Sequence, residues 1–229
     1  MGLDDEEFWN TFRAELAAIE QEIGRLRTVL DPANPIHEYF LHRLMMACEN
    51  ATGADLLGSA SLATPLTAVA RALFESVIVT YWASLNDENA TEAMTAAERE
   101  LLRIMRNTIT KGRANILHKT TREIENEAVL NHPMMKEGRR PKRFDEMAEE
   151  AGIKNIYDTF YGFLSLFAHG TASKIHMDAI LSKGPPIYEN MSLVRGCVKA
   201  ISLISKNRIE GRQTDKSDLE KILKVKLTN

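Results

Sequence analysis

Four polar side chains recur at intervals of four residues late in the chain, namely Tyr157, Tyr161, Ser165 and His169. Residues four apart lie on one face of an α-helix, so this polar row predicts a stripe along a single helix. Phenol and hydroxyl groups donate and accept hydrogen bonds, and imidazole titrates near neutral pH. A row of this composition can bind a ligand or move a proton.

Arg71 and Glu75 are the predicted counterpart of the polar row. They are also four apart, in an otherwise apolar helix predicted for residues 65–85. Arg before Glu is the weaker orientation for a helical ion pair, so a salt bridge alone does not explain them. Buried polar groups cost free energy unless they meet partners, so we expect the two helices to pack with these side chains facing each other.

Two interpretations of this arrangement remain open. In the functional one, His169 is a general base or proton donor, Arg71 holds an anion such as a phosphate, and Glu75 orients one of them. Ser165, Tyr157 and Tyr161 would then line the pocket. In the structural one, the same groups form a buried network that fixes the register of two helices.

The elements that position these residues are predicted to be helices throughout, which gives an all-α helical bundle in a single domain, residues 1–229. Residues 1–30 carry a narrow apolar stripe, typical of a long amphipathic helix that packs along another helix, for example in a homodimer. Residues 53–61 are predicted as a loop or short helix. Further helices are predicted at 36–52, 65–85, 95–130 with an interruption at Gly112, 144–151 and 153–181, with C-terminal helices in 187–229 at 188–206 and 218–226.

The order of several motifs resembles a bacterial family called domain of unknown function 5677. The Arg71/Glu75 pair, the basic stretch 140–143, the short helix from Phe144 and the polar row closed by Gly170 follow one another as in that family. The resemblance covers about residues 60–180. It implies an all-helical fold in which Arg71, Glu75, Ser165 and His169 are the marked positions, and it supplies no activity.

A looser resemblance is to the HEPN domains, helical bundles that include dimeric ribonucleases. Their signature is an Arg followed by four to six residues and a His, which Arg113 and His118 fit. The resemblance implies a metal-independent ribonuclease with this pair as catalytic residues. Ala114 departs from the pattern, because a polar residue usually follows the Arg. The alternative is a solvated helix face. Analogy with helical defence-associated proteins suggests a setting in stress or phage defence.

Residues 99–143 are strongly basic, with 12 Lys/Arg against 5 Asp/Glu, or +7, which leaves −10 for the rest of the chain. Such a segment can bind the phosphates of RNA, DNA or a nucleotide. It can equally be a solvated surface, or pair with the acidic N-terminal helix of the same or a second subunit. The candidate phosphate-binding residues are Arg99, Arg103, Arg106 and Arg113 on one helical stripe, and Arg139, Arg140, Lys142 and Arg143 in the following loop.

The composition of the chain argues against a metal site, a secreted protein and a membrane protein. The formal net charge is −3, and Cys48 and Cys197 lack the spacing of a zinc site, so we expect no metal and no cofactor. The acidic N-terminus lacks the apolar region of a signal peptide, and no run approaches 18 apolar residues, so we expect a cytoplasmic protein without a membrane span. The leading hypothesis is a binding or accessory module; an HEPN-like ribonuclease or toxin and a purely structural interaction protein are the alternatives.

Overall fold

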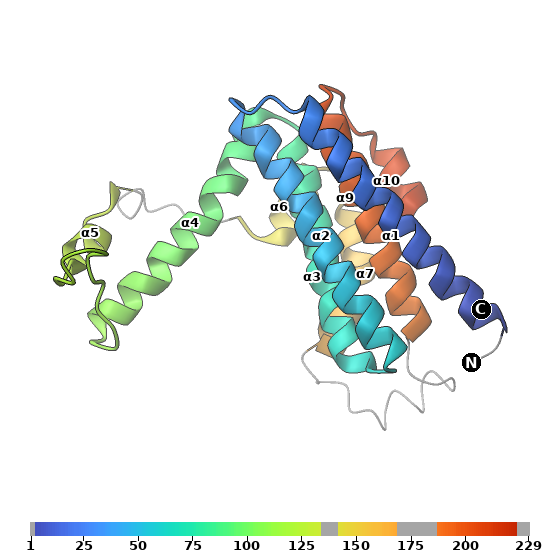
Figure 1. Cartoon of the computed structure of the whole chain (residues 1–229), viewed down its shortest axis with the longest axis horizontal. Helices are drawn as coiled ribbons and strands as arrows, with labels where there is room; N and C mark the ends of the chain where they lie inside the picture. Colours follow the sequence, from blue (N-terminus) through green and yellow to red (C-terminus); the bar gives the residue numbers. More distant parts are fainter. Residues whose placement is uncertain (1–2, 134–141, 169–186, 224–229) are drawn as a thin grey trace.

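The computed structural model describes residues 3–133, 142–168 and 187–223, and helices dominate these ranges (Figure 1). The predicted all-α class is confirmed. The helices are α1 (Leu3–Val29), α2 (Pro35–Ser59), α3 (Ala63–Ser84), α4 (Asp87–Thr110), α5 (Asn126–Leu130), α6 (Phe144–Glu150), α7 (Lys154–Ala168), α9 (Ile187–Ile209) and α10 (Lys216–Leu223).

The central helix of the bundle is α3, which contacts α2, α4, α6, α7 and α9. Its side chains Phe74, Ile78 and Trp82 are fully buried, which explains why apolar residues surround this helix on nearly every side. Among the described helices, α3 is also long and apolar enough to cross a membrane by length and composition. However, 61% of that stretch is buried inside the protein, so the bundle core accounts for its apolar character.

The N-terminal helix α1 packs along α2 and α9 of its own chain. Its stripe is buried at Phe12 and Leu26, which are 2% and 0% exposed. Charged contacts flank the stripe: Glu15 pairs with Arg195 and Lys199 of α9. The narrow stripe thus packs on helices of its own chain. A homodimer through this helix stays a prediction.

Residues 53–61, predicted as a loop or a short helix, are helical as far as Ser59 because α2 continues through them. Gly58 shows why a glycine stands in a helix here. A Cβ atom added at Gly58 would lie 2.4 Å from Cη2 of Trp9 in α1. The missing side chain therefore lets α1 approach α2 closely, and the sequence signal of a loop reflects helix packing instead.

The predicted helix 95–130 begins too late, whereas its interruption at Gly112 is confirmed and its last residue, Leu130, is the end of α5. Asn86 caps α4 by accepting a hydrogen bond from the backbone N–H of Asn89 at 2.8 Å, so the helix begins at Asp87. It ends at Thr110, and Gly112 follows with φ +64, a left-handed conformation that terminates helices. Residues 111–125 form a loop closed by an antiparallel bridge between Leu117 and Ile124, and the short α5 follows.

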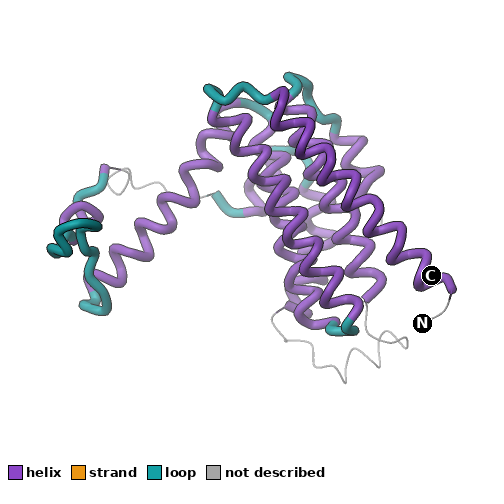
Figure 2. The backbone as a smooth tube through the Cα atoms, in the orientation of Figure 1, coloured by secondary structure: helices purple, strands orange, loops and turns teal. Residues whose placement is uncertain are grey.

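The second half of α4 leaves the bundle and carries this loop and α5 away from it (Figure 2). We call residues 99–130 the arm. The arm has a small apolar cluster of its own, separate from the main core, in which Leu102, Ile109 and Val129 are buried.

Helices α6 and α7 are joined by a tight turn that sets the direction of the polar row. Gly152, with φ +68, ends α6, and its N–H donates to the carbonyl of Glu149. Ile153, fully buried, then anchors the start of α7 in the core. The predicted helix 153–181 is described as far as Ala168, and its remainder lies outside the described residues.

Candidate functional site

Arg71 and Glu75 lie on α3 and form an ion pair in which Nε of Arg71 is 2.9 Å from Oε1 of Glu75. The two side chains are 17% and 21% exposed, in a helix whose other contacts are mostly apolar. Burial by itself lowers the pKa of Arg71, but Glu75 and Tyr161 outweigh it and hold that pKa above its usual value. The guanidinium is therefore a permanent charge at the edge of the core.

Tyr161 of α7 meets this ion pair from the facing helix. Nη2 of Arg71 donates to the Tyr161 hydroxyl at 2.8 Å, and the guanidinium carbon lies 4.9 Å from the centre of the Tyr161 ring. One side chain thus makes a hydrogen bond and a cation–π contact with the same phenol. The contact joins α3 to α7, as the spacing of the polar residues predicts.

Tyr157 extends the cluster by one turn of α7. Its ring stacks on that of Tyr161, with centroids 4.6 Å apart and planes 19° apart. Burial raises the pKa of Tyr157 to about 12, with Tyr161 adding to the effect. Tyr157 is therefore neutral at physiological pH and supports the ring of Tyr161, which contacts Arg71. We call Arg71, Glu75, Tyr157 and Tyr161 the polar cluster.

The other half of the predicted row consists of Ser165 and His169. Ser165 belongs to α7, but its side chain is outside the described residues, as is the whole of His169. Their roles as catalytic residues stay predictions. Within the described ranges, no group of three His, Cys, Asp or Glu side chains could hold a metal ion.

The described basic residues predicted to bind phosphate lie on α4, in the loop after it and at the start of α6. Arg99, Arg103 and Arg106 lie on α4, whereas Arg113 follows the end of that helix and so is not on the same helical stripe. Arg139 and Arg140 are outside the described residues. Arg103 pairs with Glu100 at 2.5 Å, on the surface of the arm.

Lys142 and Arg143 are engaged with acidic groups instead. Nζ of Lys142 is 2.8 Å from Oε2 of Glu150 and 4.8 Å from the ring centre of Trp82, whose indole N–H donates to the same Glu150 oxygen at 2.7 Å. Lys142 and Trp82 together hold the pKa of Glu150 below its usual value. Arg143 is 3.0 Å from Asp145. Trp82 of α3 thus contacts Glu150 at the end of α6 and Lys142 just before its start, whereas the Arg143–Asp145 pair is local to that start.

Arg113 and His118 lie in the loop after α4, so the expected solvated helix face is wrong. The ring nitrogen Nδ1 of His118 accepts a hydrogen bond from the backbone N–H of Thr121 at 3.1 Å, and the backbone N–H of His118 donates to the carbonyl of Glu123 at 2.8 Å. These bonds give His118 a role in shaping the loop. The geometry adds nothing in favour of the ribonuclease interpretation.

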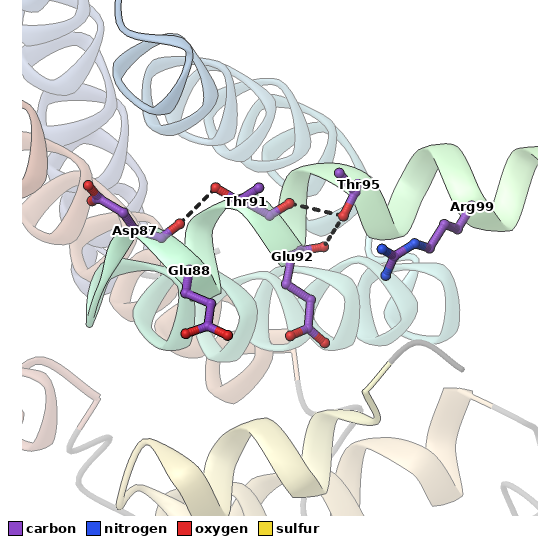
Figure 3. A pocket seen from close by; sticks show the side chains of 6 residues that line it. All are labelled: Asp87, Glu88, Thr91, Glu92, Thr95 and Arg99. Carbon is purple, nitrogen blue, oxygen red and sulfur yellow. Dashed lines mark hydrogen bonds between the residues drawn. The ribbon is translucent and has the colours of Figure 1, made fainter. Parts of the chain in front are cut away.

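A groove that the sequence did not predict runs along the first half of α4. It encloses about 390 Å³, and Glu88 and Glu92 extend from α4 toward the ribbon of α6 (Figure 3). The spacing 88, 92, 95, 99 places these groups on one helical face, but the predicted helix began too late to show it. The groove is lined by Asp87, Glu88, Thr91, Glu92, Thr95 and Arg99.

Comparison with known protein families shows that residues 37–183 match the model of a family of unknown function, DUF5677. Searches of curated proteins and of solved structures returned no significant match. The matched range begins earlier than the resemblance seen in the motifs, includes α3 and α7, and so contains the whole polar cluster. Because it covers more than half of the 229 residues, the chain belongs to the family of unknown function DUF5677.

Proposed function

We propose that the chain is a binding module whose ligand site is the polar cluster, with a small anion of the phosphate class as ligand of Arg71. The observation that carries this proposal is the double anchoring of Arg71. Glu75 holds its Nε at 2.9 Å and Tyr161 holds its Nη2 at 2.8 Å, while 17% of the side chain stays exposed. A guanidinium fixed in this way presents a planar charge that matches phosphate and carboxylate groups.

Electrostatics supports the choice of an anion. The shifted pKa of Arg71 keeps its positive charge at any physiological pH, and Glu75 neutralises it in the absence of ligand. An anion with more charge than a carboxylate can displace or share the contact with Glu75. Tyr157 and Tyr161, whose rings are stacked, offer hydroxyl groups from a rigid helix beside it. Positioned donors of this kind cost little conformational entropy when a ligand binds.

The competing explanation is a network that only fixes the register of α3 and α7, and an arginine elsewhere in the bundle provides the control. Arg43 of α2 also reaches α3, where Nη2 donates to the Ser76 hydroxyl at 2.7 Å and Nε to the Thr80 hydroxyl at 3.3 Å. It is a partly buried arginine that bridges two helices through neutral partners, so its loss should affect stability alone.

The test is thermal unfolding with increasing inorganic phosphate, against chloride at equal ionic strength. Wild-type protein and the Arg43→Gln variant should show a saturable rise of Tm with phosphate, because ligand that binds the folded state stabilises it. Arg71→Gln should remain folded and lose that rise. An unchanged phosphate response in Arg71→Gln, or no response in the wild type, would reject the anion site in favour of a structural network.

The biological setting is a separate part of the proposal. A place in stress or phage defence is supported only by the resemblance to helical defence-associated proteins. A cytoplasmic location is supported only by the composition of the chain. We propose both as working assumptions for choosing cellular assays.

A further inference from the structure

The arm concentrates two kinds of exposed side chain. Large aliphatic residues are exposed on it by 47% to 62%, namely Leu101, Ile104, Leu117 and Ile124. The arm, residues 99–130, holds seven Lys/Arg and four Glu, or +3, which leaves −6 for the rest of a chain whose total is −3. Exposed apolar side chains bordered by charges are typical of a protein–protein interface.

The arm has little to stabilise it on its own. Its cluster buries three side chains, Leu102, Ile109 and Val129, whereas the main core of the described bundle buries many more. Small units with so few buried residues are marginally stable unless another surface covers them. Figure 1 shows the arm directed away from the bundle, so the bundle helices that the structure describes do not cover it.

A surface of matching character lies on the outside of α2. Met46 and Leu56 are 41% and 68% exposed there, with the exposed Glu49 between them. Positions 46, 49, 53 and 56 fall on one helical face. Gly53 on this face has no atom within 4 Å of the place where its Cβ would be, so a partner could approach the helix backbone closely. We call this surface the α2 face.

We propose that two copies of this chain exchange arms, so that the arm of one copy packs on the α2 face of the other. The basic arm then meets the acidic body, whereas arm-to-arm pairing would bring like charges together. Because each copy supplies one arm and one α2 face, the two contacts are equivalent and the assembly closes as a symmetric dimer. Leu101 and Ile104 would contact Met46 and Leu56, with the arm's cations around Glu49.

The mass of the full-length protein in solution tests the proposal, measured by sedimentation equilibrium over a range of concentrations. The wild type should form a dimer that weakens as salt is raised, because the charges at the rim are screened. Ile104→Glu should raise the dissociation constant at least tenfold, and Leu56→Glu should do the same from the other surface. Val29→Glu, at a residue 52% exposed outside both surfaces, should leave it unchanged.

Cysteine cross-linking identifies the two surfaces. Cys48 and Cys197 are buried, and burial raises the pKa of both thiols, so they should not react. Oxidation of a mixture of Ile104→Cys and Leu56→Cys proteins should give a disulfide-linked dimer, whereas Ile104→Cys mixed with Val29→Cys should not. Circular dichroism melting curves check that each variant is folded.

Two results would overturn the proposal. One is a monomer at every concentration together with no cross-link in the mixture. The other is a monomeric protein that binds RNA or anionic lipid vesicles and loses this binding in Ile104→Glu, which would assign the arm to another class of partner.

Discussion

Arg71 is the residue on which the candidate site depends. Its contact with Glu75 is a local ion pair within α3, but its contact with Tyr161 spans 90 positions of the sequence. Residues four apart share a helical face, and this rule predicted the Arg71/Glu75 pair on one helix and the Tyr157/Tyr161 pair on another. The stacking of Tyr157 on Tyr161 could not be predicted in the same way, since ring orientation depends on the packing around α7.

Glu22 of α1 provides a test at the scale of a single titrating residue. Hydrogen bonds from Arg25 and Lys206, opposed by burial, lower the pKa of Glu22 from 4.5 to about 2. A carboxyl group whose pKa is lowered in the folded state stabilises the fold above pH 4.5, and this stabilisation is lost as the pH falls toward 2. Because the side chain is partly exposed, solvent screens much of the effect.

Glu22→Gln should therefore lower the free energy of unfolding by about 1 kcal/mol at pH 7, and have almost no effect near pH 2. Urea denaturation at a series of pH values measures this. Glu20→Gln is the control, because Glu20 is an exposed residue on the same helix. A Glu22→Gln effect that is equal at pH 7 and pH 2 would contradict the electrostatic explanation.

At the scale of helices, the sequence predicted which segments are helical better than it predicted where they end or what covers them. The apolar stripe of residues 1–30 indicated a packing partner, but a stripe carries no information on whether that partner belongs to the same chain. In the structure α2 and α9 cover it. The start of α4 was missed because the cap at Asn86 depends on backbone geometry, and the groove along that helix was missed with it.

Two glycines of α2 make the packing argument testable. Gly58→Ala should lower the free energy of unfolding by about 1–3 kcal/mol, because its Cβ would lie 2.4 Å from Trp9 and force α1 to move. Gly53→Ala should raise it by up to about 1 kcal/mol, because no atom lies within 4 Å and alanine favours a helix. Chemical denaturation of both variants compares them. Equal effects of the two substitutions would show that close packing at Gly58 is not needed.

At the scale of the whole molecule, the described chain consists of a helical bundle and an arm, and each carries one of the two proposed binding surfaces. The bundle places the polar cluster between α3 and α7, inside the range that matches DUF5677. The arm carries exposed apolar and basic residues away from that site (Figure 1). If both proposals hold, the dimer contact and the ligand site occupy different surfaces, so loss of one should leave the other intact.

The central claim is that Arg71 binds an anion, and its own side-chain signal reports this directly. In a ¹H–¹⁵N NMR titration of the arginine Nε–H groups with inorganic phosphate, we expect the Arg71 signal to move with saturation. The Arg43 signal should stay in place under the same conditions. Each signal is assigned from the spectrum of the corresponding Arg→Gln variant. An Arg71 signal that does not move at high phosphate, or that moves in step with Arg43, would contradict the account.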